Sequence, residues 1–411
     1  MADEPHAIVF FDVNKTVIMH DPVQGKGLEH ILNDLLTERA FGSVEQDADG
    51  ESHWRWNGAS ALQTTGAAGG GAEEYPMSTD STVAKQNKKQ RKAMRQDFTS
   101  PGRPGEGLAA EHRALLDVLR LPMSPATASL TAEELAAARE AAGLADSPYF
   151  FMLPAFFVFV QFMHARGAGF NIVFRTYGDD LARIAQEFNC FCEGRHPYFP
   201  SQWRLDGSDG GVDRRIHLAA GRTAGPDRGL RFGTFFRSDA VTALVMGTFA
   251  QPRGGDSAEG LAFYEQLASA SPEAPLEVHT GLPAIHHVLT HAWRAQQATL
   301  AIRDFYPFWF RNCEAARAGK LLTLDPGERA QLHALFFDDN ILPHDAHIVD
   351  ARDVRDGSPL DFRSATQGVH LLAVEPLDVI RNDRFFIDQF LASSARWGED
   401  AVASRGLAES R

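Results

Sequence analysis

Cysteine is scarce in this chain, and its scarcity excludes several classes of protein. Only three cysteines occur among 411 residues, at positions 190, 192 and 313. A sparse and odd set does not make a disulfide framework, and it suits a reducing compartment. Cys190 and Cys192 are also closer together than the ligands of a typical zinc site, so we expect buried free thiols.

Positive charge and long apolar runs are also in short supply. The formal net charge is −14, whereas a general nucleic-acid-binding protein usually has a basic excess. We therefore predict no nucleic-acid partner, and we expect the one basic run, residues 85–95, to be a solvated stretch. The most apolar segment, residues 149–163, is too short to span a bilayer, and the first residues lack a secretory signal. We predict a cytoplasmic protein without a membrane partner.

The chain does contain enough apolar sequence for a large core. It is 44% hydrophobic, and apolar runs typical of buried strands alternate with helical patterns. This alternation predicts an α/β fold around a doubly wound parallel sheet. We expect helices near residues 109–120, 131–142 and 150–166, and a long helix over residues 283–312.

Two insertions interrupt the predicted core. We assign the core to residues 1–26, 145–189 and 296–395. Residues 27–144 form a helical insertion, and its stretch 42–107, which is rich in glycine and poor in aliphatic residues, is typical of a flexible low-complexity tract. Residues 190–295 form a second insertion, with room for a mixed cap.

Polar residues follow three of the predicted buried strands. Asp12 ends the first strand, Thr176 the second, and Asp338 with Asp339 the third. Adjacent strands of an open parallel sheet present their carboxyl ends along one edge, where ligands bind. Unpaired carboxylates that converge there repel one another, and a divalent cation relieves that repulsion. The sequence therefore predicts a phosphate site assembled around Mg²⁺.

The three strand ends resemble the motifs of the haloacid dehalogenase-like (HAD-like) hydrolase superfamily, which consists mostly of magnesium-dependent phosphatases. In that family the first strand ends in D-x-D-x-T, the second in threonine or serine, and the last in paired acids, with a basic residue as a further motif. This chain has "IVFFDVNKT", "NIVFRT" and "ALFFDDN" in the same order. The resemblance covers the core segments only, and it implies a Rossmann-like core and a small phosphorylated substrate.

The resemblance also implies a role for each matching residue. Asp12 is expected to be the nucleophile that forms an aspartyl-phosphate, and Thr176 to bind a phosphoryl oxygen. Lys320 is our choice for the basic residue, with Arg303 as the alternative. The expected catalytic set is Asp12, Asn14, Thr176 and Lys320. The expected Mg²⁺ ligands are Asp12, the Asn14 carbonyl, Asp338 and Asp339. Substrate contacts are expected from Thr16, Arg175, Tyr177, Gly178 and Arg303.

Asn14 departs from the family pattern, which has a second acid at this position. That acid usually protonates the leaving oxygen and then activates water, and an amide cannot exchange a proton near neutral pH. Three interpretations therefore stay open: a phosphatase or phosphotransferase, a non-catalytic member that binds a ligand or partner, and other hydrolytic chemistry such as carbon–halogen cleavage. Asp179 and Asp180 stand where a helix is expected to begin, and the helix dipole is a sufficient reason for both acids.

Overall fold

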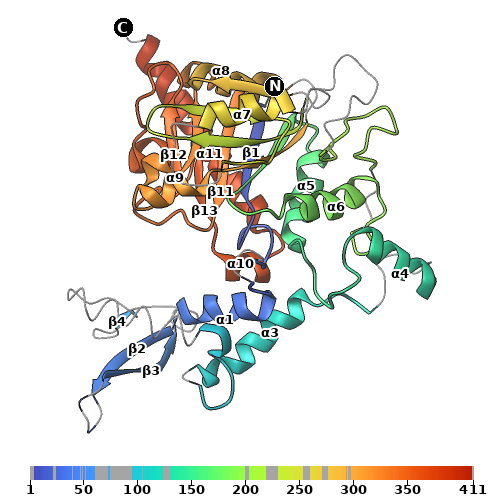
Figure 1. Ribbon diagram of the computed structural model, residues 1–411, viewed down its shortest axis with the longest axis vertical. Helices are drawn as coiled ribbons and strands as arrows, with labels where there is room; N and C mark the ends of the chain where they lie inside the picture. Colours follow the sequence, from blue (N-terminus) through green and yellow to red (C-terminus); the bar gives the residue numbers. More distant parts are fainter. Residues whose placement is uncertain are drawn as a thin grey trace. The chain divides into compact units, whose positions relative to one another are not determined.

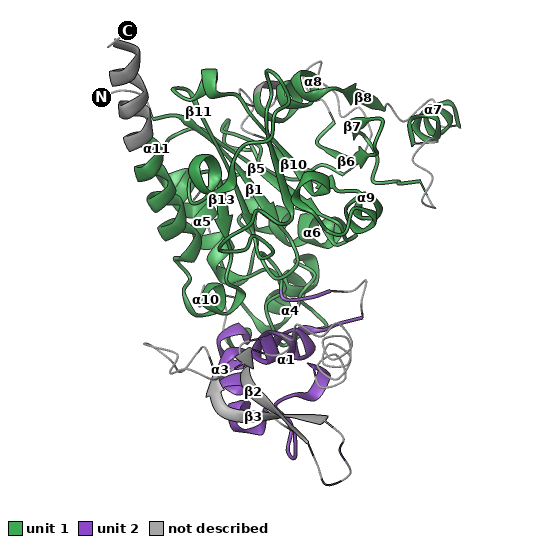
Figure 2. Ribbon diagram, turned by 90° about the vertical axis from the view of Figure 1, so that its left-hand side faces the viewer, with its two compact units in different colours: residues 1–18, 121–411 green, residues 19–120 purple. Residues whose placement is uncertain are grey.

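The computed structural model divides the chain into two compact units, which are described separately here (Figure 1). Unit 1 holds residues 1–18 and 121–411, and unit 2 holds residues 19–120 (Figure 2). The structure describes residues 4–21, 25–38, 40–46, 48, 50, 52–60, 73–74, 95–103, 105–123, 130–199, 203–218, 230–252, 260–270, 276–292, 294 and 298–409.

Unit 1 is built around a mostly parallel sheet of eight strands, which confirms the predicted α/β class. The strand order is β13-β11-β1-β5-β9-β6-β7-β8. The strands are β1 (His6–Asp12), β5 (Phe170–Thr176), β6 (Phe232–Arg237), β7 (Thr242–Met246), β8 (Glu277–Thr280), β9 (Thr299–Arg303), β11 (Leu332–Asp338) and β13 (Leu371–Ala373). The pairs from β13 through to β6 are parallel, and β7 pairs antiparallel with both β6 and β8. Every residue of β1, β5 and β11 is buried, as their continuous apolar runs predict.

Helices cover one face of this sheet. They are α5 (Pro154–Ala165), α6 (Leu181–Cys192) and α11 (Phe385–Glu409). The ring of Phe11 in β1 packs edge to face on Phe156 of α5 and on Phe386 of α11, with centroids 5.2 Å apart in each case. Phe156 also lies 5.8 Å from Phe188 of α6. These aromatic contacts hold the three helices beneath the strands that end in the candidate site.

A small second sheet covers the other face. It pairs β10 (Lys320–Leu324) with β12 (Val349–Asp353), and the short helices α8 (Leu282–His287) and α9 (Tyr306–Arg311) pack in the same core. Successive strand residues point to opposite faces, so Phe10 faces this layer, and its ring stacks on Phe336 of β11 at 5.6 Å. The placement of β10 matters for function, because its first residue is Lys320.

Three of the helices are ones that the sequence predicts. The capping box of Thr131 and Glu134 begins α4 (Ala132–Ala141), as expected from their spacing. The helix predicted near 109–120 is α3 (Ala109–Leu119), and the one near 150–166 is α5. Unit 1 also contains α7 (Gly260–Ala270) and α10 (Pro376–Arg381). Among the described residues, each helix is either too short or too polar to cross a lipid bilayer.

The long helix predicted over residues 283–312 is wrong. In its place α8 ends at His287, a π-helical turn covers Val288–Ala292, and β9 and α9 follow. The run Thr299–Ile302 is fully buried, and it belongs to β9, which lies between β5 and β6 in the central sheet. Short apolar runs fit a buried strand and a buried helix equally well, so periodicity alone could not separate them.

The second predicted insertion, residues 190–295, does not form a separate cap in the described part of the chain. Its strands β6, β7 and β8 extend the central sheet beyond β9. The six residues of β6 are all buried, and the first three pair with β9. A hydrophobic strand with two buried faces is stabilised by joining the existing sheet, and the sequence does not specify that partner.

The described part of unit 2 contains helices and a three-stranded antiparallel sheet in the order β3-β2-β4. It contains α1 (Leu28–Glu38), α3, β2 (Ala40–Gln46), β3 (Ser52–Ser60) and β4 (Glu73–Glu74). Most of the antiparallel pair β2–β3 lies in the tract 42–107, so part of the predicted low-complexity tract forms paired strands. Residues 61–72 and 75–94, which carry about half of the tract and nearly all of the basic run, lie outside the described residues.

Candidate functional site

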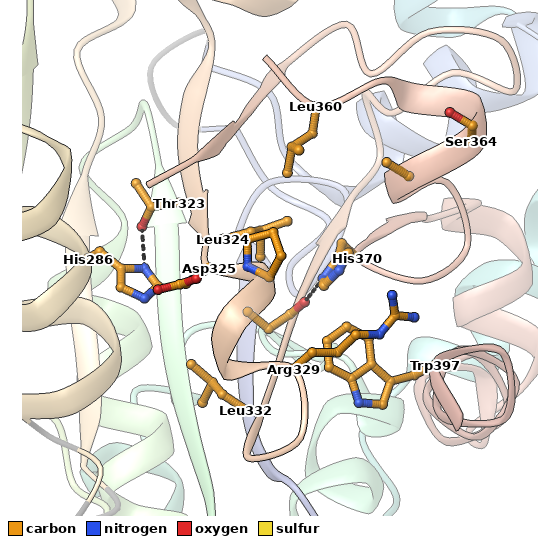
Figure 3. A pocket seen from close by; sticks show the side chains of 13 residues that line it. His286, Thr323, Leu324, Asp325, Arg329, Leu332, Leu360, Ser364, His370 and Trp397 are labelled. Carbon is orange, nitrogen blue, oxygen red and sulfur yellow. Dashed lines mark hydrogen bonds between the residues drawn. The ribbon is translucent and has the colours of Figure 1, made fainter. Parts of the chain in front are cut away.

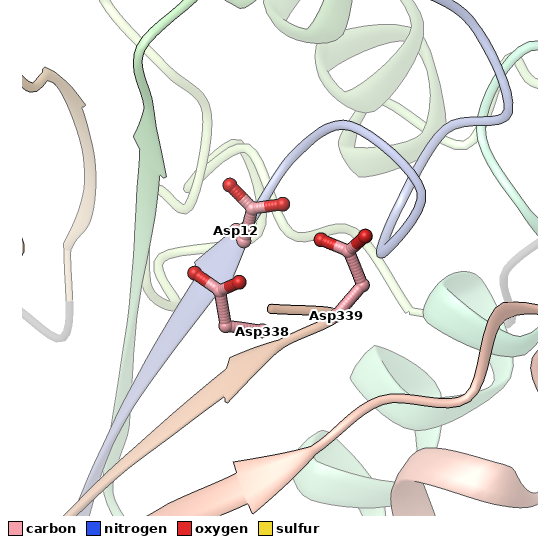
Figure 4. Close-up of side chains that lie close together, drawn as sticks. All are labelled: Asp12, Asp338 and Asp339. Atoms are coloured by element: carbon pink, nitrogen blue, oxygen red, sulfur yellow. The ribbon is translucent and has the colours of Figure 1, made fainter. Parts of the chain in front are cut away.

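Three carboxylates meet at the carboxyl edge of the central sheet. Asp12 is the last residue of β1, Asp338 is the last residue of β11, and Asp339 follows it (Figure 4). The two strands are neighbours, with Phe11 paired to Phe337, so their ends are brought side by side. One oxygen from each carboxylate lies within 4.8 Å of the others. The convergence expected from the three motifs is therefore present at this edge.

Burial and the charge of a neighbouring carboxylate raise the pKa values of two of these carboxylates. Burial raises the pKa of Asp12 to about 7, the Lys320 ammonium opposes that rise, and the charge of Asp338 adds to it. Burial and the charge of Asp12 also raise the pKa of Asp339 well above its usual range, although part of the Asp339 surface reaches solvent. A group of closely spaced carboxylate oxygens suits a hard cation such as Mg²⁺. The donor set therefore fits the expected metal.

Lys320 stands between two of the carboxylates. Its Nζ donates hydrogen bonds to Asp12 and, over 2.8 Å, to Asp338, and its side chain is almost fully buried. Burial alone would lower the pKa of Lys320, but the charges of Asp12 and Asp338 outweigh it and raise that pKa. The alternative basic residue, Arg303, ends β9, which β5 separates from β1. The structure thus brings Lys320 rather than Arg303 to the nucleophile position.

Two buried arginines hold the backbone on either side of Lys320. Arg175 donates to the carbonyl of Leu321 over 3.1 Å and forms a two-pronged ion pair with Asp304, at 2.6 and 2.8 Å. Arg175 was expected to contact substrate, yet its guanidinium lies in the core, 4.4 Å from the centre of the Phe235 ring. The structure places it beneath the site, where it fixes the strand that carries Lys320.

Arg237 acts on the preceding residue in the same way. Its guanidinium donates to the carbonyl of Gly319 and pairs with Asp350 at 2.6 Å. A Cβ at Gly319 would lie 2.0 Å from the carbonyl oxygen of Ile348, so this position requires glycine. Lys320 therefore starts from a backbone that is anchored at both of its flanking carbonyls.

The loop after β1 links the ends of β1 and β11. The Thr16 hydroxyl donates to Asp12 over 3.3 Å and accepts the Asp339 backbone N–H over 3.2 Å. Asn340 adds a second link, since its backbone N–H donates to Asp338 over 2.9 Å and its amide to Asp339 over 2.8 Å. Thr16 therefore orients the expected nucleophile and one expected metal ligand at once.

Asn14 lies on the other side of the site, toward β5. Its side-chain oxygen accepts the Thr176 hydroxyl over 3.3 Å, and its amide donates to the Asp180 carboxylate over 3.1 Å. Thr176 in turn accepts the Gly178 N–H over 2.9 Å. A Cβ at Gly178 would lie 2.9 Å from the Asp180 carboxylate, so the small residue lets these groups approach. The structure thus brings Asn14, Thr176 and Gly178 together beside Asp180.

Asp180 is a site residue that the sequence interpretation missed. It occupies the N-cap position of α6, yet its side chain forms no capping hydrogen bond. The buried carboxylate is turned to the Asn14 amide, 166 residues away in the chain. Helix capping was a sufficient explanation for an acid at this position, and only the fold reveals the contact with Asn14. Its neighbour Asp179 is exposed.

Tyr177 closes the Lys320 side of the site. Its ring centre is 5.3 Å from the Lys320 Nζ, and its ring stacks on Trp309 of α9 at 5.5 Å. Burial raises the pKa of the Tyr177 hydroxyl well above its usual range, so Tyr177 borders the site as an uncharged side chain. Tyr306, which is 40% exposed, packs edge to face on the same ring.

The edge of the sheet therefore combines an oxygen cluster for a cation, a buried ammonium group and a buried carboxylate on the opposite side. These groups can bind an anion that is bridged to a metal, and they place a nucleophilic carboxylate beside it.

Comparison of the chain with protein-family models, with curated proteins and with solved structures finds no match.

Proposed function

We propose that this chain is a Mg²⁺-dependent hydrolase of the HAD-like type, which transfers the phosphoryl group of a small phosphorylated metabolite to Asp12 and then to water. One observation carries the proposal. Asp12, Asp338 and Asp339 place carboxylate oxygens within 4.8 Å, and Lys320 bridges two of them. A doubly wound HAD-like core is the finer fold assignment that goes with this function.

The residues of the β11 side hold and orient the reacting groups. Asp12, Asp338, Asp339 and the Asn14 carbonyl are the proposed ligands of Mg²⁺, which when bound offsets the charge of the phosphoryl group. Lys320 lowers the repulsion between the Asp12 carboxylate and the incoming anion. Thr16 restricts the rotation of Asp12, because it donates to the carboxylate oxygen that Lys320 does not contact.

The β5 side supplies the proton, and Asp180 replaces the missing second acid. As an oxygen of Asp12 attacks phosphorus, the bond to the leaving oxygen breaks and that oxygen takes a proton from Asp180. In the second step Asp180 takes a proton from water, the water oxygen attacks phosphorus, and the bond to Asp12 breaks to release phosphate. The support is the buried carboxylate of Asp180, 3.1 Å from the amide of Asn14, where the family has its acid.

A non-catalytic ligand-binding protein is the second candidate. Asn14 favours it, because the amide is tied to both Thr176 and Asp180 and cannot itself move a proton. The two candidates differ in whether Asp12 becomes phosphorylated.

The proposal is tested by hydrolysis of p-nitrophenyl phosphate with and without Mg²⁺. Wild-type protein is expected to release nitrophenolate only with Mg²⁺, and Asp12→Asn to lose about a thousandfold or more, as is typical when a nucleophile is removed. Asp117→Asn, at an exposed position of α3, is the control. Equal rates for wild type and Asp12→Asn would contradict the proposal.

A further inference from the structure

A second cavity lies at the opposite edge of the central sheet (Figure 3). Its volume is about 230 Å³. Leu332 and Ala334 line it from the start of β11, and Thr323 and Leu324 line it from the end of β10. Because β11 runs from Leu332 and Ala334 to Asp338, the cavity lining and the candidate active site are roughly 13–20 Å apart along the strand. The cavity is therefore separate from that site.

The cavity has an apolar floor and an open mouth. Leu332 and Ala334 are buried at its base, whereas Ser364 and Ala365 are exposed at its rim. Both rim residues belong to the π-helical turn Phe362–Thr366. A ligand can thus enter from solvent and cover apolar surface that would otherwise contact water.

The two ends of the cavity differ in charge. At one end the Arg329 guanidinium lies over the Trp397 ring, 4.6 Å from its centre (Figure 3). At the other end the Asp325 carboxylate accepts the backbone N–H of Gly327 over 2.7 Å, and His286 pairs with the Glu328 carboxylate at 3.1 Å. The acids thus lie at one end of the cavity, and the cation–aromatic pair is the positively charged end, which suits an incoming anion.

We propose that this cavity binds a small organic anion in which one carboxylate is joined to a planar ring. The carboxylate pairs with Arg329, since a guanidinium matches a carboxylate in two parallel hydrogen bonds. The ring packs on Leu332 and beside the indole of Trp397. The volume lies below the range typical of sites for larger ligands, so a single ring is the size that fits.

The test is calorimetric titration of the full chain with benzoate, benzyl alcohol and benzylamine, which share a ring and differ in charge. Benzoate is expected to bind once per chain, and the other two not measurably. Arg329→Gln is expected to weaken benzoate binding by about tenfold or more, the loss typical of a charge-assisted hydrogen bond. Ala365→Trp, a substitution at the exposed rim, is expected to block the mouth without disturbing the core.

Two controls keep this site apart from the proposed function. Arg363→Gln removes an exposed arginine from the same helical turn and is expected to leave benzoate binding unchanged. Asp12→Asn is also expected to bind benzoate like the wild type, whatever its effect on catalysis. Absence of benzoate binding, equal binding of benzylamine, or wild-type affinity in both Arg329→Gln and Ala365→Trp would overturn the proposal.

Discussion

The two sides of the β1 end differ in the kind of group that they present. Toward β11, Asp12 meets Asp338 and the ammonium group of Lys320, so this side is made of ions. Toward β5, Asn14 and Thr176 are joined by a hydrogen bond, and the Asp180 carboxylate accepts from the Asn14 amide. We call this the neutral side, because the two residues that follow the ends of β1 and β5 carry no charge, and we call the side toward β11 the ionic side. In the proposed function, binding therefore falls to the side toward β11 and proton transfer to the side toward β5. The ionic side has every group that the family resemblance implies. The neutral side differs from the family at one position, because Asn14 stands where the family has a second acid.

The ionic side is expected to control stability most strongly. Lys320→Met leaves the buried carboxylates of Asp12 and Asp338 without a counter-charge, so the free energy of unfolding without Mg²⁺ should fall by about 3–5 kcal/mol. Urea titration measures this loss. Arg384→Met, which breaks an exposed pair with Asp388 at 3.8 Å, is the control and should cost about 1 kcal/mol at most. If Lys320→Met also lowers the free energy of unfolding by only about 1 kcal/mol or less, the ionic side stabilises the fold no more than an exposed ion pair does, and this expectation is contradicted.

The neutral side is expected to control the release of phosphate from Asp12. Asp180→Asn removes the proposed proton carrier, so hydrolysis of the phosphorylated protein should slow by about a hundredfold or more while its formation from a good leaving group changes less. Single-turnover kinetics with p-nitrophenyl phosphate separate the two steps. Asp179→Asn, one residue away and exposed, is the matched control. If both variants release phosphate at the wild-type rate, Asp180 has no part in the reaction.

The pH dependence of stability should also separate the two sides. Burial raises the pKa of Asp12 to about 7 in the folded chain, against an ordinary value of 3.8, so the folded state binds more protons between these values. Stability of the metal-free protein should therefore fall by about 2–3 kcal/mol between pH 5 and pH 8. Urea unfolding at pH 5 and pH 8 tests it. Asp12→Asn should lack this contribution, and an identical pH profile for the variant would contradict the assignment.

Exchanging the two groups on the neutral side should have the smallest effect. The double variant Asn14→Asp with Asp180→Asn restores the acid at the family position and keeps an amide as its partner. We expect phosphate release within about tenfold of the wild type, and clearly faster than in Asp180→Asn alone, because one acid is again present. Single-turnover rates of the two variants decide this. A double variant as slow as Asp180→Asn would show that Asn14 is not the position from which a proton reaches the substrate.

Much of the ionic side could be predicted because each of its residues directly ends or begins a buried strand. An apolar run followed by Asp12, or by Asp338 and Asp339, is visible in the sequence, and parallel strands bring such ends to one edge. Lys320 required one further inference, namely that a basic residue shortly before the last strand faces the same edge. The structure places its ammonium group there.

The neutral side was harder to predict because its contacts depend on the fold rather than on local pattern. Asp180 looks like a helix-capping acid until Asn14, 166 residues away, is placed beside it. Arg175 stands one residue before Thr176, yet strand alternation sends its side chain to the opposite face, where it pairs with Asp304. The same lack of long-range information explains the missed strand β9 and the sheet extension by β6, β7 and β8.

The most direct test of the central claim is the mass of the protein after an acid quench. Protein is mixed with Mg²⁺ and p-nitrophenyl phosphate, quenched within the first turnovers, and digested for peptide mapping. The proposed function predicts one phosphoryl group on Asp12, and a larger phosphorylated fraction in Asp180→Asn than in Asp179→Asn. Binding of Mg²⁺ without any phosphorylated Asp12, in the wild type and in Asp180→Asn alike, would contradict it.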